Sequence, residues 1–295
     1  MSDCELISTL VAQGVPVSVT CRTLQIARSR YYRANEAPTR QQTTRQPARL
    51  RSGGEDELEL VELIKAIKLE HPFWGYRRVR ALAKKRLGKA INRKRVYRLM
   101  KHHGLLVQVK HYKAKRTPQT HKPKAAHKNH WWGSDMTKFY VHTVGWVYLV
   151  IVLDWFSRKI VGHSFDLRPK TDLWINALQM AVQNECPAGS RSYDIHLMTD
   201  NGSQPTSQKY ETIVQTLGIE HVTTSYANPK GNAETERAIR TFKEEAVWPN
   251  EFFSYAEALA IGERTISFYN NEYPHSALGE LSPIEYEQLT SHKAA

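Results

Sequence analysis

Hydrophobic side chains recur with helical spacing up to residue 106 and with strand spacing beyond residue 130. Near the start, the pattern predicts short helices over Glu5–Gln13, Val17–Leu24 and Ala27–Arg33. A short helix, a turn and a basic helix outline a helix-turn-helix, whose reading face would carry Arg28, Ser29, Arg30 and Arg33. A small dimerisation or docking element has the same pattern, so both interpretations stay open. Residues 36–54 are polar and lack periodicity, which predicts a linker.

A second and stronger helical pattern covers residues 55–106. Apolar positions predict three helices, over Asp56–Glu70, Tyr76–Leu87 and Arg93–His103. Gly88 breaks the chain before the last helix, and Asn92 can cap that helix. The last helix has an apolar stripe and an otherwise cationic surface, as does a recognition helix in a DNA major groove, although a solvated helix of a bundle has the same pattern. The DNA-facing side chains expected in this domain are Arg77, Arg78, Arg93, Lys94, Arg95, Tyr97, Arg98 and Lys101.

Beyond residue 130 the pattern predicts an α/β domain. Three strands, over Ser134–His142, Trp146–Trp155 and Lys159–Asp166, follow one another as an antiparallel meander. Helices and strands then alternate over Thr171–Asn184, Asp194–Thr199, Ser207–Leu217, Glu220–Thr224 and from Asn232 onward. This βββαβαβα order is the RNase H-like plan. The predicted division is therefore a helical segment with linker (1–54), a helix-turn-helix domain (55–106), a basic connector (107–130) and an α/β core (131–295).

Charge is distributed unevenly between the two halves of the chain. The 295 residues carry 42 Lys/Arg against 29 Asp/Glu, but residues 1–130 hold 29 against 9 and residues 131–295 hold 13 against 20. A basic half joined to an acidic half indicates a polyanion-binding part tethered to a metal-binding part. The three cysteines form no Cys-x-x-Cys pair, so neither a disulfide framework nor a Cys-based zinc site is expected. No run is long and apolar enough for a membrane span, and we expect a bacterial cytoplasmic protein, associated with the nucleoid.

Three acidic residues stand in the settings that a metal site requires. Asp135 falls in a predicted strand, Asp200 follows another strand, and Glu236 lies in the first turns of a helix that Asn232 can cap. Their intervals are 64 and 35 residues, and such carboxylates can converge at one edge of a sheet. Oxygen ligands suit Mg²⁺, and a pair of these ions clamps a phosphorus centre for in-line displacement. The alternative is solvated surface charge, because chance alone supplies acids with any chosen spacing.

The residues around these acids carry a family resemblance. Trp132-Gly-Ser-Asp-Met-Thr137, Thr199-Asp-Asn-Gly-Ser203, Asn232-Ala-Glu-Thr-Glu236 and Tyr269-Asn-Asn-Glu-Tyr-Pro-His-Ser-Ala-Leu278 resemble motifs of the transposases of two-frame bacterial insertion sequences. Those enzymes belong to the DDE superfamily and share a catalytic core with retroviral integrases. Two positions depart from the family pattern, since Arg237-Ala238 stands where an aromatic pair is frequent and Tyr273 where Arg is frequent.

The resemblance implies an activity and a set of roles. Asp135, Asp200 and Glu236 would bind two Mg²⁺ ions, with Mn²⁺ as a substitute, for 3′-end cleavage and strand transfer of DNA. Lys243 would contact the DNA end, and Lys230, before the helix, a phosphate. Expected partners are double-stranded DNA of element ends and target, a second copy of the chain because synapsis needs at least a dimer, and the product of the upstream frame.

Three alternatives to these roles follow from the same residues. A structure-specific nuclease with the same core would cleave DNA without strand-transfer products. A repressor whose core is only a scaffold would show no Mg²⁺-dependent nicking. Asp154 is a rival catalytic acid, but an Asp that closes a β-turn commonly bonds to local backbone, so it is expected to be structural.

Overall fold

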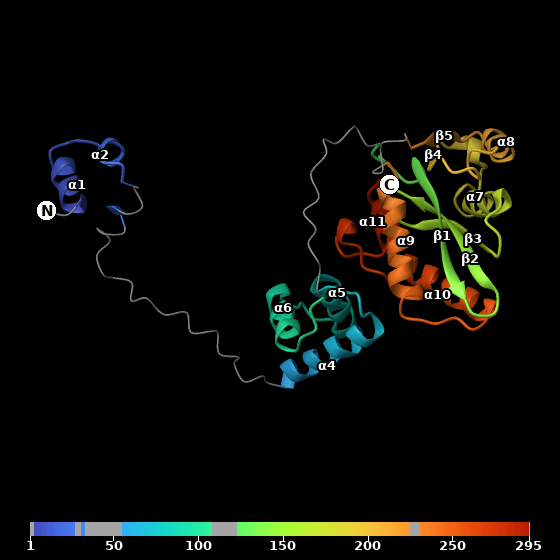
Figure 1. Ribbon diagram of the computed structural model, residues 1–295, viewed down its shortest axis with the longest axis horizontal. Coiled ribbons are helices and arrows are strands. Elements are labelled where there is room, and N and C mark those ends of the chain that lie inside the picture. The colour runs from blue at the N-terminus through green and yellow to red at the C-terminus, as the bar shows by residue number, and fades with distance from the viewer. Residues whose placement is uncertain (1–2, 27–30, 33–54, 108–122, 225–230, 295) are drawn as a thin grey trace. The chain divides into compact units, whose positions relative to one another are not determined.

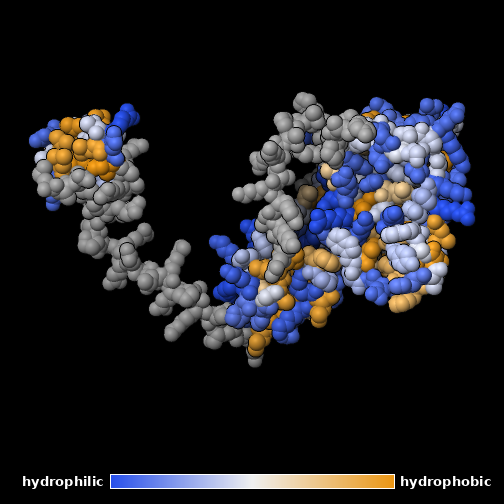
Figure 2. Space-filling model, viewed as in Figure 1, coloured by the Kyte–Doolittle hydropathy of each residue, from blue (hydrophilic) through white to orange (hydrophobic). Residues whose placement is uncertain are grey.

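Residues 3–26, 31–32, 55–107, 123–224 and 231–294 are described by the computed structural model, which divides into units of residues 1–58 and 59–295 (Figure 1). The first unit contains α1 (Asp3–Ala12) and α2 (Val17–Thr23), close to two of the predicted helices. Ile7, Cys21 and Tyr31 form its small core, and hydrophobic side chains gather on its visible face (Figure 2). Most of the predicted third helix, its four reading-face residues and the linker lie outside the described residues.

Three helices between residues 55 and 102 match the prediction within one residue at each end. They are α4 (Glu55–Glu70), α5 (Tyr76–Leu87) and α6 (Arg93–His102). Gly88 ends α5 in the left-handed region at φ 62°, where glycine has no steric penalty. The Asn92 side chain accepts a hydrogen bond from the Lys94 backbone N–H (2.8 Å), so the predicted cap of α6 is confirmed.

The core is a five-stranded sheet in the order β3-β2-β1-β4-β5. Its strands are β1 (Trp131–Val141), β2 (Gly145–Asp154), β3 (Ile160–Asp166), β4 (His196–Thr199) and β5 (Glu220–Thr223). The first three pair antiparallel, and β4 and β5 run parallel to β1. The helices are α7 (Thr171–Glu185), α8 (Gln208–Thr216), α9 (Ala233–Phe242), α10 (Tyr255–Asn271) and α11 (Pro283–Ala294). The predicted βββαβαβα order is confirmed.

Alternation along the strands sends side chains to two separate hydrophobic layers. Trp132, Val150 and Val152 pack with α7 and α8 on one face of the sheet. Phe139 and Ile151 pack with α9 and α10 on the other. A side chain's position along β1, odd or even, therefore decides which helices it meets.

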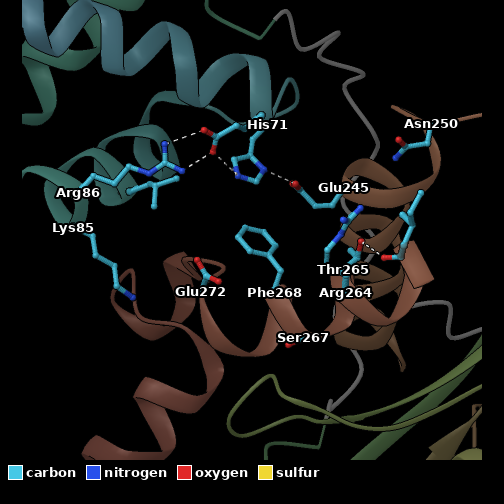
Figure 3. A pocket seen from close by; sticks show the side chains of 13 residues that line it. His71, Lys85, Arg86, Glu245, Asn250, Arg264, Thr265, Ser267, Phe268 and Glu272 are labelled. Atoms are coloured by element: carbon cyan, nitrogen blue, oxygen red, sulfur yellow. Dashed lines mark hydrogen bonds and ion pairs between the residues drawn. The ribbon is translucent and has the colours of Figure 1, made fainter. Parts of the chain in front are cut away.

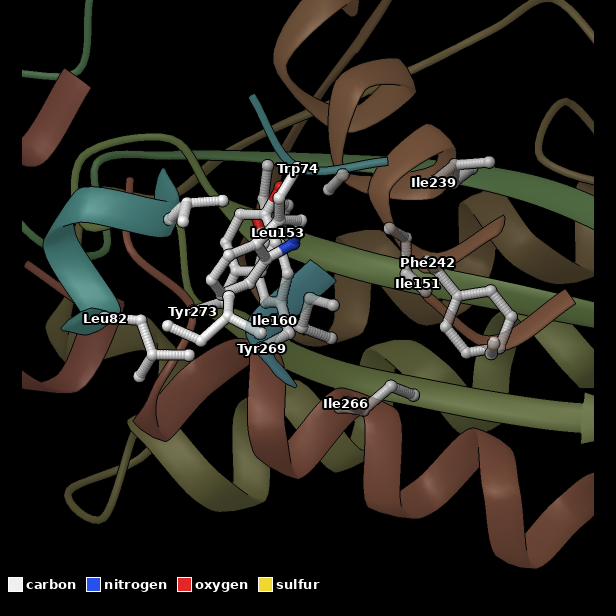
Figure 4. Close-up of a cluster of buried hydrophobic side chains, with 14 of the residues drawn as sticks. Trp74, Leu82, Ile151, Leu153, Ile160, Ile239, Phe242, Ile266, Tyr269 and Tyr273 are labelled. Atoms are coloured by element: carbon white, nitrogen blue, oxygen red, sulfur yellow. The ribbon is translucent and has the colours of Figure 1, made fainter. Parts of the chain in front are cut away.

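The three-helix domain shares the second of these layers. Trp74, fully buried, lies among core side chains that include Leu153, Tyr269 and Tyr273 (Figure 4), with its ring centroid 5.6 Å from that of Tyr273. Its indole N–H donates to Glu245 Oε1 (2.6 Å). Because a Trp side chain is the largest apolar group a protein can bury, this contact makes a substantial link between α4–α5 and the core.

After α9 the chain continues as a single π-helical turn, Lys243–Val247, closed by a hydrogen bond from the Trp248 N–H to the Lys243 carbonyl oxygen (2.8 Å). Such turns occur mostly as local widenings of α-helices, frequently at functional sites. The turn carries Lys243 at its start and Glu245, the Trp74 partner, two residues later.

Candidate active site

The parallel register of β1 and β4 aligns two of the three acids. Trp132 pairs with Leu197 and Gly133 with Met198, so continuing the register by two residues sets Asp135 beside Asp200. Met198 lies in the layer under α9 and α10, and Asp200, two residues on, is directed to the same face. Asp135 shares the odd positions of β1 with Phe139, which lies in that layer too. Both aspartates therefore face α9.

Glu236 is brought to this edge by close packing of α9 on β1. The buried Asn232 amide donates to the Ser134 carbonyl oxygen (2.9 Å), and the Trp155 indole N–H donates to Thr235 Oγ1 (3.2 Å). Gly133 permits this approach, because a Cβ there would lie 2.1 Å from Thr235 Oγ1. The prediction that Asn232 caps α9 with its side chain is wrong, since that amide is used to hold β1 instead.

The electrostatics of Asp135 depend on three charged groups from other elements. Burial, followed by the charges of Asp200 and Glu236, raises the pKa of Asp135 to about 6, against the opposing effects of the Met136 N–H hydrogen bond and the Lys243 ammonium. Groups from the end of β4, from α9 and from the π-turn thus act on the Asp135 carboxyl of β1. A carboxyl group whose protonation is displaced in this way is a feature of functional sites.

The carboxylates of Asp135, Asp200 and Glu236 lie near one another but do not form a complete set of metal ligands. Among the described residues, the set of three potential metal-ligand atoms that all lie within 4.8 Å of one another comes from His130, Asp194 and His196, and not from the three acids. Asp135 Oδ1 accepts from the Met136 N–H (2.7 Å) and Asp200 Oδ1 from the Gly202 N–H (3.1 Å). As the side chains are placed, the three carboxylates do not converge on one ion position. The donor set, three carboxylates with no nitrogen or sulfur, fits Mg²⁺ or Mn²⁺.

The histidine-containing set lies at the opposite end of β4 from Asp200. His130 Nδ1 accepts a hydrogen bond from the Ala126 N–H (3.1 Å). A neutral imidazole that accepts at Nδ1 carries its proton on Nε2, which then cannot bind a metal. This hydrogen bond argues against a metal site there.

Asp154 is structural, as its position in a turn predicts. The side chain is fully buried, and its oxygens accept from the Asn129 N–H (3.1 Å), the Ser157 N–H (2.8 Å) and the Ser157 hydroxyl (2.7 Å). These bonds satisfy the carboxyl group within the turn between β2 and β3. Burial nevertheless raises the pKa of Asp154.

The basic residues predicted to face DNA fall into exposed and partly buried groups. Among the predicted DNA contacts on α5 and α6, two side chains are half-buried, those of Arg78 and Arg95. The exposed ones are Arg77, Arg93, Lys94, Tyr97, Arg98 and Lys101. Tyr76, Arg93, Lys94 and Tyr97 line a cavity of about 220 Å³. Of the other predicted contacts, Lys230 lies outside the described residues and Lys243 lies beside the acids.

Other basic side chains of α5 pair with acids of the core. Arg80 pairs with Glu280 (2.9 Å) and Lys85 with Glu285 (2.5 Å). Figure 3 shows a neighbouring cavity of about 810 Å³, in which His71 Nδ1 lies 2.7 Å from Glu245 Oε2. The basic character of α5 therefore has two separate causes, which composition alone does not distinguish.

Comparisons with known proteins agree with this geometry. Two family models described as "Integrase core domain" match residues 125–229 and 217–283, and together span more than half of the chain. A model described as "HTH-like domain" matches residues 55–113. The transposase InsD for insertion element IS2A/D/F/H/I/K of Escherichia coli is 28% identical over 94% of this chain and 92% of its own length, and InsD of IS2-9 from strain K12 is 28% identical over 94% and 91%.

Solved retroviral structures are also similar in part. A simian T-cell lymphotropic virus intasome in complex with PP2A regulatory subunit B56 gamma has a TM-score of 0.47 at 19% identity, covering 77% of this chain and 74% of that one. The HTLV-2 integrase catalytic core domain in complex with magnesium has a TM-score of 0.43 at 18% identity, covering 56% and 99%. Both TM-scores lie below 0.5, so the assignment depends on the sequence matches and on the sheet topology.

A helix-turn-helix domain followed by an RNase H-like integrase core defines a polynucleotidyl transferase that binds DNA. The chain belongs to the DDE transposases of bacterial insertion sequences, which have such a core and use divalent metal ions. None of the helices in the described part of the chain combines the length and apolar character that a bilayer crossing requires.

Proposed function

We propose that the chain cleaves the 3′ ends of its insertion element and joins them to target DNA, with Asp135, Asp200 and Glu236 holding two Mg²⁺ ions. The observation that supports this most strongly is that Asp135 lies beside Asp200 in the register of the sheet and that the charges of Asp200 and Glu236 both act on its carboxyl group. Bound ions would lower the pKa of the attacking water or 3′-hydroxyl and stabilise charge on the leaving 3′-oxygen.

The protein's own groups then have separate tasks. Asp135 must lose its proton to bind a cation, and a pKa of about 6 leaves it mainly ionised at neutral pH. Lys243 brings a positive charge to the same site and is suited to a phosphate of the DNA end. Lys230, in the segment before α9, is proposed as a second phosphate contact.

DNA would be positioned by the exposed cations of α5 and α6, and two copies of the chain would hold two element ends. We keep the boundaries 1–54, 55–106, 107–130 and 131–295 as the proposed functional division. The product of the upstream frame is a further proposed partner in end recognition.

The test uses a linear duplex that ends in the element's terminal repeat, incubated with a supercoiled target in Mg²⁺ or in EDTA. The proposal predicts Mg²⁺-dependent nicking at the 3′ end and strand-transfer products, both absent with Asp200→Asn and retained with Asp194→Asn, an exposed acid two residues before β4. Nicking without strand transfer would identify a nuclease. Activity of Asp200→Asn equal to wild type would refute the metal site.

A further inference from the structure

A cavity of about 290 Å³ beside α9 is lined by three arginines from three separate elements. Arg78 comes from α5, Arg158 from the turn after β2, and Arg237 from α9, directly after Glu236. Tyr273 and His275 line the same cavity, which we call the arginine pocket after these five residues.

The positive charge of this pocket is only partly neutralised by protein groups. Arg158 pairs with Glu234 (3.2 Å), whereas Arg237 is 3.9 Å from Glu244. Arg78 lies over the Tyr273 ring, 4.8 Å from its centroid, and forms no ion pair with any residue in the described ranges. Arg78 and Arg158 are half-buried, whereas Arg237 is exposed at the mouth of the cavity. A half-buried cation without full compensation is unfavourable, and an anion in the cavity would relieve this cost for Arg78 above all.

Two buried polar atoms in the pocket also have no partner. Neither His275 Nε2 nor Tyr273 Oη makes a hydrogen bond to the described part of the chain, and Tyr273 is only 1% exposed. The Thr241 hydroxyl, which donates to the Arg237 carbonyl oxygen (3.0 Å), lies close enough to lower the pKa of Tyr273, so His275 Nε2 is the clearer orphan of the two. Buried polar groups are nearly always paired in native proteins, so an unpaired imidazole nitrogen at this cavity indicates a missing ligand.

The His275 side chain is suited to donate a hydrogen bond to an anion. Burial, followed by the charges of the three arginines, lowers the pKa of His275 to about 3, so its imidazole is neutral at pH 7. A neutral ring can carry its hydrogen on Nε2. The pocket then offers three guanidinium groups, one hydroxyl and one imidazole N–H as donors, and its lining includes one carboxylate, that of Glu234, which pairs with Arg158.

We propose that the arginine pocket binds a phosphate group of the DNA backbone. Guanidinium groups recognise phosphate oxygens in a planar, bidentate manner, and three separate elements supply one such group each to this cavity. That the phosphate belongs to DNA rests on the proposed function, whereas the anion site itself depends only on the pocket. Because Arg78 lies on α5 and Arg237 follows Glu236, one phosphate would tie the helix-turn-helix domain to the catalytic helix.

The anion site is tested with inorganic phosphate alone, by calorimetry and thermal unfolding of the full chain against chloride at matched ionic strength. Wild type should bind phosphate and be stabilised by it, and Arg237→Gln should bind about 10- to 100-fold more weakly, as for loss of one charge-assisted contact. Arg240→Gln is the matched control, because Arg240 lies on the same helix, pairs with Glu244 (2.9 Å) and does not line the pocket. Equal phosphate responses of the two variants would overturn the proposal.

The Tyr273→Phe variant distinguishes a hydroxyl that binds phosphate from one that stabilises the fold. If the hydroxyl serves a ligand, its removal weakens phosphate binding and leaves the unliganded protein as stable as wild type or more so. A loss of unliganded stability with unchanged phosphate binding would show a structural hydroxyl and contradict the assignment.

The salt dependence of duplex binding tests whether the phosphate that the pocket binds belongs to DNA. Arg237→Gln should lower the slope of log affinity against log salt by about one, the effect of losing one phosphate contact. Lys209→Gln, on α8 at the other face of the sheet and paired with Asp172, should not change it. Loss of the phosphate response with an unchanged slope would overturn the DNA assignment and leave a small-anion site. If both effects appear but the wild-type protein does not cleave DNA, the proposed function is wrong and the phosphate site in the arginine pocket is still supported.

Discussion

Replacing Asp135 by Asn should make the protein more stable while it abolishes activity. The pKa of Asp135 rises from 3.8 to about 6 on folding, because the ionised form is buried beside two other acids. This rise in the pKa means that the ionised Asp135 side chain destabilises the fold by roughly 3 kcal/mol at pH 8. Asn has nearly the same shape and keeps an oxygen for the Met136 N–H, so most of this penalty should disappear.

The effect depends on pH in a defined direction. Between pH 4 and 6 the folded state holds a proton that the unfolded state has lost, so wild-type stability falls as pH rises through this window. The variant lacks this titration. The stability difference should therefore be about 2–3 kcal/mol at pH 8 and close to zero at pH 4.

Urea unfolding in EDTA at pH 4 and pH 8, followed by Trp fluorescence, measures both values. Asp194→Asn serves as the control, since an exposed side chain should change stability by less than about 0.5 kcal/mol. A destabilised Asp135→Asn protein at pH 8, or a stability gain that does not vary with pH, would refute the electrostatic account of the site.

Three further substitutions test the supports of the site. Gly133→Ala should push α9 from β1 and lower the free energy of unfolding by about 1–3 kcal/mol in urea titrations. The control Gly75→Ala, with nothing within 4 Å of the added Cβ, should lower it by less than about 1 kcal/mol. Equal losses in the two variants would contradict the close approach of α9 to β1. Asp154→Asn should cost about 1–3 kcal/mol of stability yet leave the cleavage rate per folded molecule intact, and a selective rate loss would restore Asp154 as a catalytic candidate. Glu245→Ala leaves the Trp74 indole N–H without its acceptor and should speed hydrogen exchange in α4 and α5 while β1 and β2 stay protected; unchanged exchange would contradict the docking.

Local patterns predicted most of the fold because each is decided within a few residues. Strand alternation located β1 and β2, and the Gly88 and Asn92 signals bounded α5 and α6 to within a residue. The settings of Asp135, Asp200 and Glu236, together with a family resemblance, predict that these acids form the metal site. That resemblance also implied Lys243, whose charge the structure places beside Asp135.

The parts that were missed depend on contacts between distant segments. Asn232 looked like a helix cap, but its amide bonds to Ser134, 98 residues away. Nothing local distinguishes Arg158 or Arg237 from solvated arginines, because their shared cavity exists only after folding. The π-helical turn at Lys243 has no signal in the hydrophobic pattern.

Manganese binding measures the central claim most directly, because Mn²⁺ can be counted by calorimetry and by electron paramagnetic resonance without DNA. Asp135, Asp200 and Glu236 should hold the same ions, so replacing any one of them by its amide should weaken the same Mn²⁺ signal, and Asp154→Asn should leave it unchanged. If one of the three amide variants binds Mn²⁺ as wild type does, the three acids do not form a shared metal site.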